Sequence, residues 1–324
     1  MSETAGAFWV ARPGHGEIRT APLAAPGPDE IRVRMLVSGI SRGTEMLVFR
    51  GQVPASQRDL MRCPFQAGDF PGPVKYGYSA VGLVEAGPDA LVGRRVFCLH
   101  PHQDRFNLPA AAALPVPDGV PTRRAVLAAN LETALNGIWD AGALPGDRIA
   151  IVGAGVVGGL FAALAARLPG AQVTLVDRDP ARADLARALG CGFALPEAAP
   201  ADQDLVVQAS GVAAGLALAL GLAGFEATVL DMSWYGDQPV VLPLGEAFHA
   251  KRLAIRASQV GAVAPAQRPR WSHRRRLGLA LDLLADPLYD RFLDGESAFA
   301  DLPETMAHLS RDGAGALCRL VLYP

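Results

Sequence analysis

Cysteine is scarce in this chain of 324 residues, and the few cysteines are not arranged in CxxC pairs. The spacing excludes a zinc ribbon and the disulfide framework of a small secreted domain. We therefore expect four reduced thiols, which are Cys63, Cys98, Cys191 and Cys318.

The sequence also lacks an excess of positive charge. Its formal net charge is -2 and its pI about 6.3. No overall positive field would attract nucleic acid or an anionic membrane surface, so neither is expected as a partner. A small-molecule substrate is the expected ligand.

A secretory signal is a third feature that the sequence lacks. The first ten residues, "MSETAGAFWV", contain no basic region followed by an apolar core, so a cytoplasmic location is expected. The uncharged run Ile149–Ala166 is 18 residues long, at the lower limit for a membrane span. Its four glycines favour a glycine-rich turn instead.

What the chain does have is enough apolar material for two cores, since half of it is hydrophobic. Short strands separated by Gly and Pro predict a β-rich domain over residues 1–124. Strands alternating with Ala-rich helices predict an α/β domain with a doubly wound parallel sheet over residues 125–261. Residues 262–324 are expected to return to the first domain.

The segment "IAIVGAGVVGG" places Gly153, Gly155 and Gly158 in GxGxxG spacing, between a β-branched strand and an Ala-rich helix. In a dinucleotide site the first glycine makes a tight turn, the second lets a pyrophosphate approach, and the third lets helix pack on strand. The free amides at the helix N-terminus, including those of Val156 and Val157, would bind the phosphates. A tight strand-to-helix corner without a ligand and an S-adenosylmethionine site are the alternatives.

The next strand, "QVTLVDRD", ends at Asp177. An acid there accepts hydrogen bonds from the ribose hydroxyls and repels a 2'-phosphate, which favours NAD over NADP. Arg178 follows and could accommodate a 2'-phosphate, so NADP stays possible. Ser210 and Ser233, which follow later strands of the same fold, are further candidate cofactor contacts, with core packing as the alternative for Ser233.

The order of "SGISRGTE", "GYSAVGLVEAG", "GRRVF", "GAGVVG" and "VDRD" resembles the medium-chain dehydrogenase/reductase superfamily of zinc-type alcohol dehydrogenase-like proteins. The resemblance implies a GroES-like catalytic domain and a Rossmann dinucleotide-binding domain. Within the superfamily, the chain looks most like the bacteriochlorophyllide 3-hydroxyethyl dehydrogenase branch. A homodimer, paired through the strand in "RASQVG", is implied by the resemblance alone.

Zinc-dependent members of the superfamily carry a cysteine, a Gly-His-Glu triplet and a Cys or Glu at three points. This chain has Ser41, the triplet Gly77-Tyr78-Ser79 and Ala129 there. Hydroxyl and methyl groups cannot replace thiolate and imidazole as zinc donors, so no catalytic zinc is expected. The four-cysteine structural zinc lobe is missing as well.

Without zinc, general acid chemistry must polarise the substrate oxygen while hydride is exchanged. We expect Tyr78 and His100 to supply it. Thr44 matches the proton-relay threonine of the superfamily if "GISRGTE" carries one inserted residue, and Glu45 would orient its neighbours. Tyr78 could instead only fill the space left by the metal, and His100 could only line the pocket.

Cys98, His100 and His102 alternate and are expected on one strand face, where they could form a new metal site. The simpler interpretation makes His102 a loop residue. The basic run "QRPRWSHRRR" is interpreted as the start of a helix capped by Ser272, with its apolar face buried and its arginines solvated.

The sequence thus predicts a zinc-independent, NAD(H)-dependent oxidoreductase that interconverts an alcohol and a carbonyl. Reduction of an activated C=C bond with NADPH is the second enzymatic interpretation. A protein that binds the nucleotide without catalysis is the third.

Overall fold

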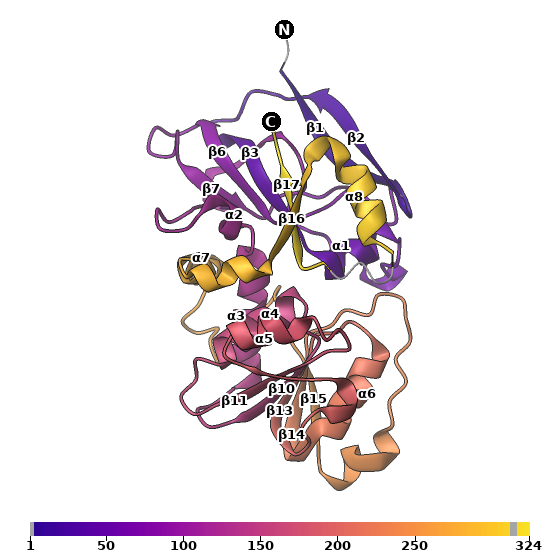
Figure 1. Cartoon of the computed structure of the whole chain (residues 1–324). Helices are drawn as coiled ribbons and strands as arrows, with labels where there is room; N and C mark the ends of the chain where they lie inside the picture. The colour runs from indigo at the N-terminus through magenta and orange to yellow at the C-terminus, as the bar shows by residue number, and fades with distance from the viewer. Residues whose placement is uncertain (1–2, 312–315) are drawn as a thin grey trace. The chain divides into compact units, whose positions relative to one another are not determined.

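The structure is a computed structural model and describes residues 3–311 and 316–324. It divides into two compact units (Figure 1). The first unit contains the described residues up to Ala129 and those from Leu281 onward, and the second unit is Asn130–Ala280. The first unit is therefore built from both ends of the chain.

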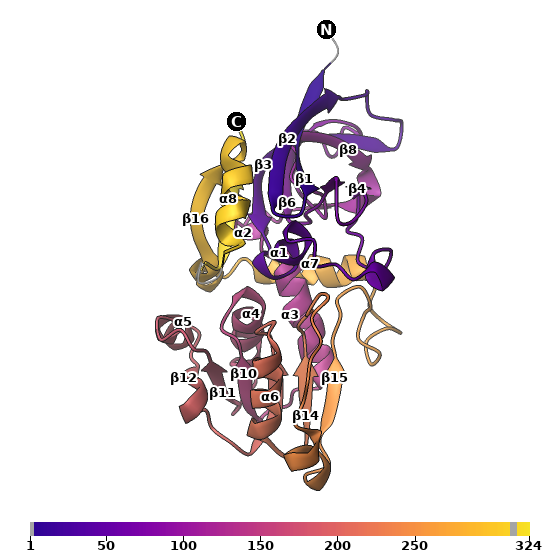
Figure 2. The ribbon, with the colours of Figure 1, turned by 90° about the vertical axis from the view of Figure 1, so that its right-hand side faces the viewer.

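The first unit is β-rich, and its larger sheet has the strand order β16-β17-β3-β6-β7-β9 with β8 paired to β3. A smaller sheet has the order β2-β1-β5-β4. The C-terminal strand β17 lies between β16 and β3 (Figure 1). Helix α8 lies beside β16 (Figure 2). The strands are β1 Thr4–Arg12, β2 His15–Pro22, β3 Glu30–Ile40, β4 Ala67–Gly68, β5 Val74–Lys75, β6 Ala80–Ala86, β7 Arg95–Cys98, β8 Arg105–Pro109, β9 Ala113–Pro115, β16 Leu293–Ala298 and β17 Cys318–Leu322; the helices are α1 Arg42–Phe49, α2 Thr122–Ala125 and α8 Leu302–Leu309.

Strand β3 shows why this sheet forms. Its buried residues alternate with partly exposed ones, as expected for a strand with one face on a core. Ile31, Val33 and Met35 are completely buried and pack with residues of β6, β7 and β8.

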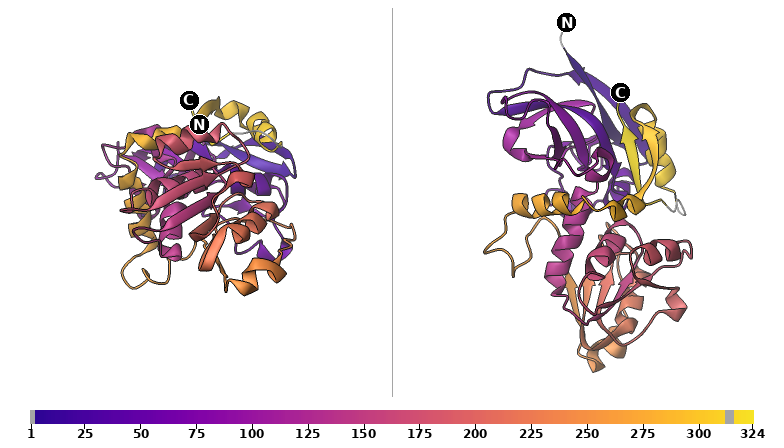
Figure 3. Two further views of the ribbon diagram at one scale, coloured as in Figure 1. Left: turned by 60° about the horizontal axis from the view of Figure 1, so that its bottom comes forward. Right: turned by 60° about the vertical axis from the view of Figure 1, so that its left-hand side comes forward.

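The second unit contains a six-stranded sheet in the order β12-β11-β10-β13-β14-β15, and every neighbouring pair is parallel (Figure 3). Helix α4 packs on β10 and β11, and α6 packs on β10, β13 and β14. The strands are β10 Arg148–Val152, β11 Gln172–Val176, β12 Gly192–Ala194, β13 Gln203–Gln208, β14 Ala223–Asp231 and β15 Ala254–Ala257; the helices are α3 Ala128–Ala141, α4 Val156–Ala165, α5 Arg182–Ala188, α6 Ala213–Leu222 and α7 His273–Leu283. The predicted fold class, a doubly wound parallel sheet with a separate β-rich domain, is confirmed.

The boundaries of the second unit differ from those expected at residues 125 and 261. Residues 262–280 group with the second unit, and one cause is Arg276 of α7. Its guanidinium donates to Glu132 Oε1 at 3.0 Å and also bonds Asn136 Oδ1 and the Val260 carbonyl.

Arg276 also corrects the interpretation of the basic run. Ser272 does cap the helix, because its Oγ accepts a hydrogen bond from the Arg275 amide at 3.1 Å. Leu277 and Leu281 are buried as expected, but Arg276 is only 1% exposed and is not solvated. The carboxylate and amide partners on α3 make its burial possible, and they cannot be inferred from α7 alone.

Among the described residues, no helix combines the length and hydropathy needed to cross a bilayer. The uncharged run that reaches membrane-span length contains β10, the glycine-rich turn and α4.

Candidate functional site

The three glycines of the second unit have the geometry that a dinucleotide turn requires. Gly153 has φ +105°, and a Cβ there would lie 2.7 Å from the Ser210 backbone. A Cβ on Gly158 would lie 2.0 Å from the Gly153 carbonyl oxygen, so only glycine fits. A Cβ on Gly155 would meet no described atom within 4 Å, which leaves the side from which a phosphate would approach open.

Helix α4 starts directly after Gly155, and the first intrahelical bond is donated by the Gly159 amide to the Gly155 carbonyl. The amides of Val156, Val157 and Gly158 precede that bond and belong to the helix N-terminus. Such amides, together with the helix dipole, stabilise negative charge. The turn can therefore hold a pyrophosphate.

Asp177 follows β11 and is fixed by two backbone amides. Its Oδ2 accepts a hydrogen bond from Ala154 at 2.7 Å, and its Oδ1 accepts one from Asp179 at 2.9 Å. The carboxylate thus stands beside the glycine-rich turn, where an acid would meet ribose hydroxyls. The neighbouring Arg178 is exposed.

Ser210 and Ser233 meet in a polar cluster at the carboxyl ends of β13 and β14. The buried Gln208 donates to Ser210 Oγ at 2.9 Å, and Ser233 Oγ accepts from the Gly211 amide at 3.1 Å. The Tyr235 hydroxyl donates to Asp231 Oδ2 at 3.0 Å. Partial burial raises the pKa of Asp231, and it raises that of Tyr235 to about 12.

In the first unit, Glu45 organises the start of α1. Its Oε1 accepts a hydrogen bond at 2.8 Å from the amide of Ser41, the residue that caps α1, much as the acid of a capping box does. Its Oε2 lies 2.8 Å from His102 Nε2. Both side chains are almost fully buried, at 2% and 1% exposure. The expected orienting role of Glu45 thus has two specific partners.

Tyr78 lies against the same turn and is partly buried. Loss of solvent raises the pKa of its phenol well above the usual value, and the charge of Glu45 raises it further. Hydrogen bonds with the hydroxyls of Ser41 and Thr44 act in the opposite direction. The phenol therefore stays protonated at neutral pH and can donate a hydrogen bond to an oxygen. The structure brings Tyr78, Thr44 and Glu45 together.

His100 has a different environment. Its ring stacks on Phe106 with the ring centroids 3.6 Å apart, and its Nδ1 lies 2.9 Å from the Pro101 carbonyl oxygen. Burial, with the nearby charge of Lys75, lowers the pKa of His100 to about 3. The ring is therefore neutral at physiological pH and is held within the core of the unit.

Strand β7 ends at Cys98, which corrects the expectation that Cys98, His100 and His102 share one strand face. His102 lies in the following loop but is buried, with Nδ1 2.7 Å from Ser38 Oγ and Nε2 on Glu45. The sequence had suggested either a metal site shared with Cys98 and His100 or a simple loop position for His102. Its only sequence signal was the alternation with His100, because its partners lie 57 and 64 positions away.

The residues at the zinc-ligand positions do not fit that metal. Ser41 and Tyr78 offer hydroxyl oxygens, which bond each other, in place of thiolate and imidazole. In the part of the chain that the structure describes, no three His, Cys, Asp or Glu side chains are grouped to hold a metal ion.

Ser79, beside Tyr78, is 1% exposed. Its Oγ has no hydrogen-bond partner among the described residues. A buried hydroxyl without a partner costs free energy, so this position differs from the satisfied hydroxyl groups around it.

These two units, one with a dinucleotide turn and one GroES-like, have the architecture that the resemblance to the medium-chain dehydrogenases implies. Two solved structures share the fold across nearly the whole chain. A Sinorhizobium meliloti 1021 protein described as a zinc-binding dehydrogenase and bound to NADP is 20% identical, with a TM-score of 0.78 over 99% of both chains. A short chain alcohol dehydrogenase from Escherichia coli CFT073, complexed with NADH, is 17% identical, with a TM-score of 0.78 over 98% of this chain and 99% of the other.

Curated relatives support the same class. D-guloside 3-dehydrogenase of Escherichia coli K12 is 25% identical over 308 residues, which cover 86% of this chain and 88% of the relative. The 2-desacetyl-2-hydroxyethyl bacteriochlorophyllide A dehydrogenase of Cereibacter sphaeroides is 40% identical over 83 residues, 25% of this chain and 23% of the relative. The family model described as ketopantoate reductase PanE/ApbA matches residues 149–210. The predicted resemblance to medium-chain dehydrogenases, including the bacteriochlorophyllide branch, is confirmed.

Proposed function

We propose that the protein interconverts an alcohol and a carbonyl by zinc-independent hydride exchange with NAD(H). The observation that carries the proposal is the hydroxyl group of Tyr78, held by Ser41 and Thr44 beside the buried Glu45. In this proposal the neutral phenol takes the position that a zinc ligand has in the zinc-dependent members of the superfamily. It supplies a hydrogen-bond donor for a substrate oxygen where the superfamily uses a Lewis acid.

The second unit supplies the cofactor site in this proposal. The amides of Val156 and Val157, opposite the open side of Gly155, hold the pyrophosphate, and Asp177 accepts hydrogen bonds from the ribose. A nicotinamide held by this unit would accept or supply the hydride. Ser210 and Ser233 hold the ends of β13 and β14 through their hydrogen bonds with Gln208 and the Gly211 amide.

In this proposal the first unit gives and accepts the proton of the reaction. In reduction, the Tyr78 O–H polarises the carbonyl oxygen and gives it a proton. In oxidation, the alcohol returns that proton to Tyr78. Thr44 hydrogen bonds the phenol and relays the proton, whereas His100, neutral and stacked on Phe106 in the core of the first unit, has no part in the transfer.

Both curated relatives are named dehydrogenases of hydroxyl-bearing compounds, a sugar glycoside and a hydroxyethyl pigment. Because the relative that spans most of this chain is a guloside dehydrogenase, we propose a secondary hydroxyl, and sugar derivatives are the first substrates to screen. The four free cysteines agree with the expected reducing cytoplasm.

A homodimer is proposed through β15, which is at the edge of the six-stranded sheet and exposed along its whole length. An edge strand offers unpaired backbone groups to a second copy. Ile255→Lys would place a charge in that contact. A mass measurement in solution that finds a monomer for the unchanged protein would remove this part of the proposal.

The first test is a fluorescence titration of the purified protein with NADH and, separately, with NADPH. Saturable binding of NADH alone supports Asp177 as the selector and justifies a screen of secondary alcohols for NADH formation. A preference for NADPH favours C=C reduction instead. Binding without turnover of any alcohol, ketone or enone indicates a nucleotide-binding protein that is not an enzyme.

A further inference from the structure

A continuous chain of hydrogen bonds leaves the Tyr78 site on the side of Glu45. Glu45 Oε2 lies 2.8 Å from His102 Nε2, and His102 Nδ1 lies 2.7 Å from Ser38 Oγ. Ser38 Oγ lies 2.9 Å from the hydroxyl of Tyr323. The four residues come from α1, from the loop after β7, from β3 and from the end of the chain after β17.

The middle members of this chain of hydrogen bonds are buried. Glu45, His102 and Ser38 are each at most 2% exposed. Every link has the length of a normal or short hydrogen bond. Each intermediate member can accept a proton on one side and donate one on the other.

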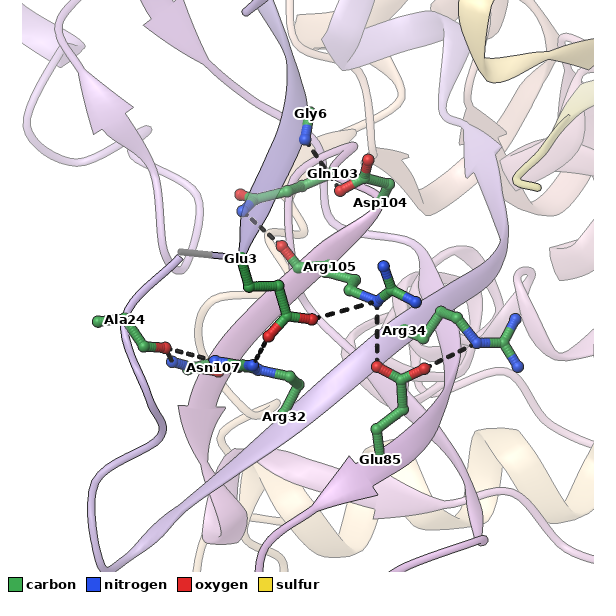
Figure 4. Close-up of polar contacts among 10 residues, drawn as sticks. All are labelled: Glu3, Gly6, Ala24, Arg32, Arg34, Glu85, Gln103, Asp104, Arg105 and Asn107. Carbon is green, nitrogen blue, oxygen red and sulfur yellow. Dashed lines mark hydrogen bonds and ion pairs between the residues drawn. The ribbon is translucent and has the colours of Figure 1, made fainter. Parts of the chain in front are cut away.

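The outer end of the chain opens on a pocket of about 660 Å³ within the first unit. Tyr323, stacked on Phe299 with centroids 4.6 Å apart, forms part of the wall. Asp104 lines the same pocket and accepts a hydrogen bond from the Gly6 amide at 2.9 Å (Figure 4). A pocket wall with a carboxylate and a phenol can exchange protons with water.

The charges around Asp104 are largely paired with one another. Arg105, its neighbour on β8, bonds Glu85 at 3.1 Å, and Arg34 bonds the same carboxylate at 2.9 Å (Figure 4). Burial raises the pKa of Asp104, so this carboxyl takes up a proton more readily than an exposed one. Asp104 and Tyr323 therefore line one pocket in which a proton can be taken up from water.

We propose that Tyr323, Ser38 and His102 form a proton relay between this pocket and Glu45. The proposal rests on the proposed function, in which each reduced carbonyl consumes one proton. Tyr323 passes its hydroxyl proton to Ser38, Ser38 passes its own to His102 Nδ1, and His102 passes its Nε2 proton to Glu45. Water in the pocket returns a proton to Tyr323.

The net result is one proton moved from the pocket to Glu45, with only O–H and N–H bonds broken and formed. Protonated Glu45, whose charge in the ionised form acts on the Tyr78 phenol, then returns its proton to Tyr78 after the phenol has protonated the substrate oxygen. Oxidation of the alcohol runs the same transfers outward.

The experiment measures how fast the His102 ring proton exchanges with water, by NMR of the full-length protein labelled with ¹⁵N-histidine. The signal is assigned by its nuclear Overhauser contacts with Phe8, whose ring meets that of His102 edge-on. Tyr323→Phe and Ser38→Ala each remove one hydroxyl and should slow the exchange about tenfold, less than the loss of a direct acid costs a reaction. The double variant should be no slower than Ser38→Ala alone.

Ser310→Ala is the matched control. Its hydroxyl donates to the Ala307 carbonyl of α8 and takes no part in the chain, so exchange should stay unchanged. Unchanged or faster exchange in both relay variants overturns the relay, even in an active enzyme. Slowed exchange in a protein that oxidises no alcohol supports the relay and counts against the proposed function.

Turnover gives the second measurement. Ser38→Ala should lower kcat about tenfold and enlarge the solvent deuterium isotope effect, with the Kd for NADH unchanged. A fall in kcat with an unaltered isotope effect would indicate a structural role for Ser38 and contradict the relay.

Discussion

His102 Nε2 lies 2.8 Å from Glu45 Oε2 in the dry interior of the first unit. The pair joins the loop after β7 to the first turn of α1, so the loop and the helix that carries Thr44 are fixed together. Burying such a pair costs folding free energy unless the remaining polar atoms of the two side chains are hydrogen-bonded. Here Ser38 satisfies His102 Nδ1, and the Ser41 amide satisfies Glu45 Oε1.

Tyr78→Phe should lower kcat for alcohol oxidation by about 10²-fold, within the usual range for general acid–base groups. The substitution removes the donor to the substrate oxygen and keeps the ring. Steady-state kinetics with the substrate found in the screen measure it. Tyr76→Phe is the control, since the Tyr76 hydroxyl donates to the Met61 carbonyl at 3.4 Å. Unchanged turnover in Tyr78→Phe would remove this residue from the chemistry.

Glu45→Gln should lower the pKa of the Tyr78 phenol. The negative charge of Glu45 raises that pKa, so its removal favours the phenolate. The absorbance of tyrosinate, followed during an alkaline titration, should show one phenol ionising at lower pH than in the parent. The signal is assigned by its absence in the double variant Glu45→Gln/Tyr78→Phe. Glu85→Gln is the control. Glu85 bonds Arg34 and Arg105, so its replacement should leave the titration of Tyr78 unchanged.

Asp177→Ala should weaken NADH binding by about 10- to 100-fold, because hydrogen bonds to a charged group contribute about 1.5–3 kcal/mol each. It should weaken NADPH binding less, because the repulsion of a 2'-phosphate is lost as well. Fluorescence titration with both nucleotides measures the ratio. The companion Arg178→Ala should affect NADPH more than NADH. An equal loss for both nucleotides in Asp177→Ala would argue that the carboxylate only supports the turn through Ala154.

His100 should make the protein less stable in acid. Its pKa falls from 6.5 in the unfolded chain to about 3 in the folded protein, so the unfolded state binds more protons between these values. The contribution of His100 to the free energy of unfolding is therefore fully present above pH 6.5. It falls as the pH drops below that value, by about 2 kcal/mol at pH 5. His100→Phe keeps the stack on Phe106 and should remove this part of the pH dependence. Urea unfolding at several pH values measures it, with the exposed His15→Gln as the control.

Glu132→Ala should destabilise the second unit by about 3–5 kcal/mol, because it leaves the buried Arg276 without its carboxylate. Replacing both residues, as Glu132→Gln with Arg276→Met, should cost much less than the single change. Chemical denaturation gives the free energies of unfolding. The exposed pair Arg187–Asp184 provides the comparison, since Asp184→Asn should cost at most about 1 kcal/mol. Similar losses at the two sites would contradict the assigned difference in burial.

The sequence predicted what local spacing determines. Gly153, Gly155 and Gly158 lie within six residues, and their geometry follows from one turn. The glycine-rich turn could therefore be predicted from the sequence. The parallel sheet followed likewise from the alternation of strands and helices. Tyr78 became a candidate because it stands where zinc-dependent members of the superfamily carry a histidine.

The partners of buried polar groups could not be predicted in this way. Arg276 looked like a solvated residue because Glu132 is 144 positions away, and His102 looked like a loop residue because Glu45 and Ser38 come from other elements. The loss of solvent around a buried polar group, and the hydrogen bonds that offset it, depend on the assembled unit. A sequence pattern along one element does not contain them.

The discontinuous first unit has a consequence for synthesis. Strand β3 is made early, but its neighbour β17 consists of residues 318–322, so the larger sheet stays incomplete until those residues have been synthesised. The second unit is continuous and is complete once Ala280 has left the ribosome. We expect it to fold first, and β17 to close the β-rich unit afterwards.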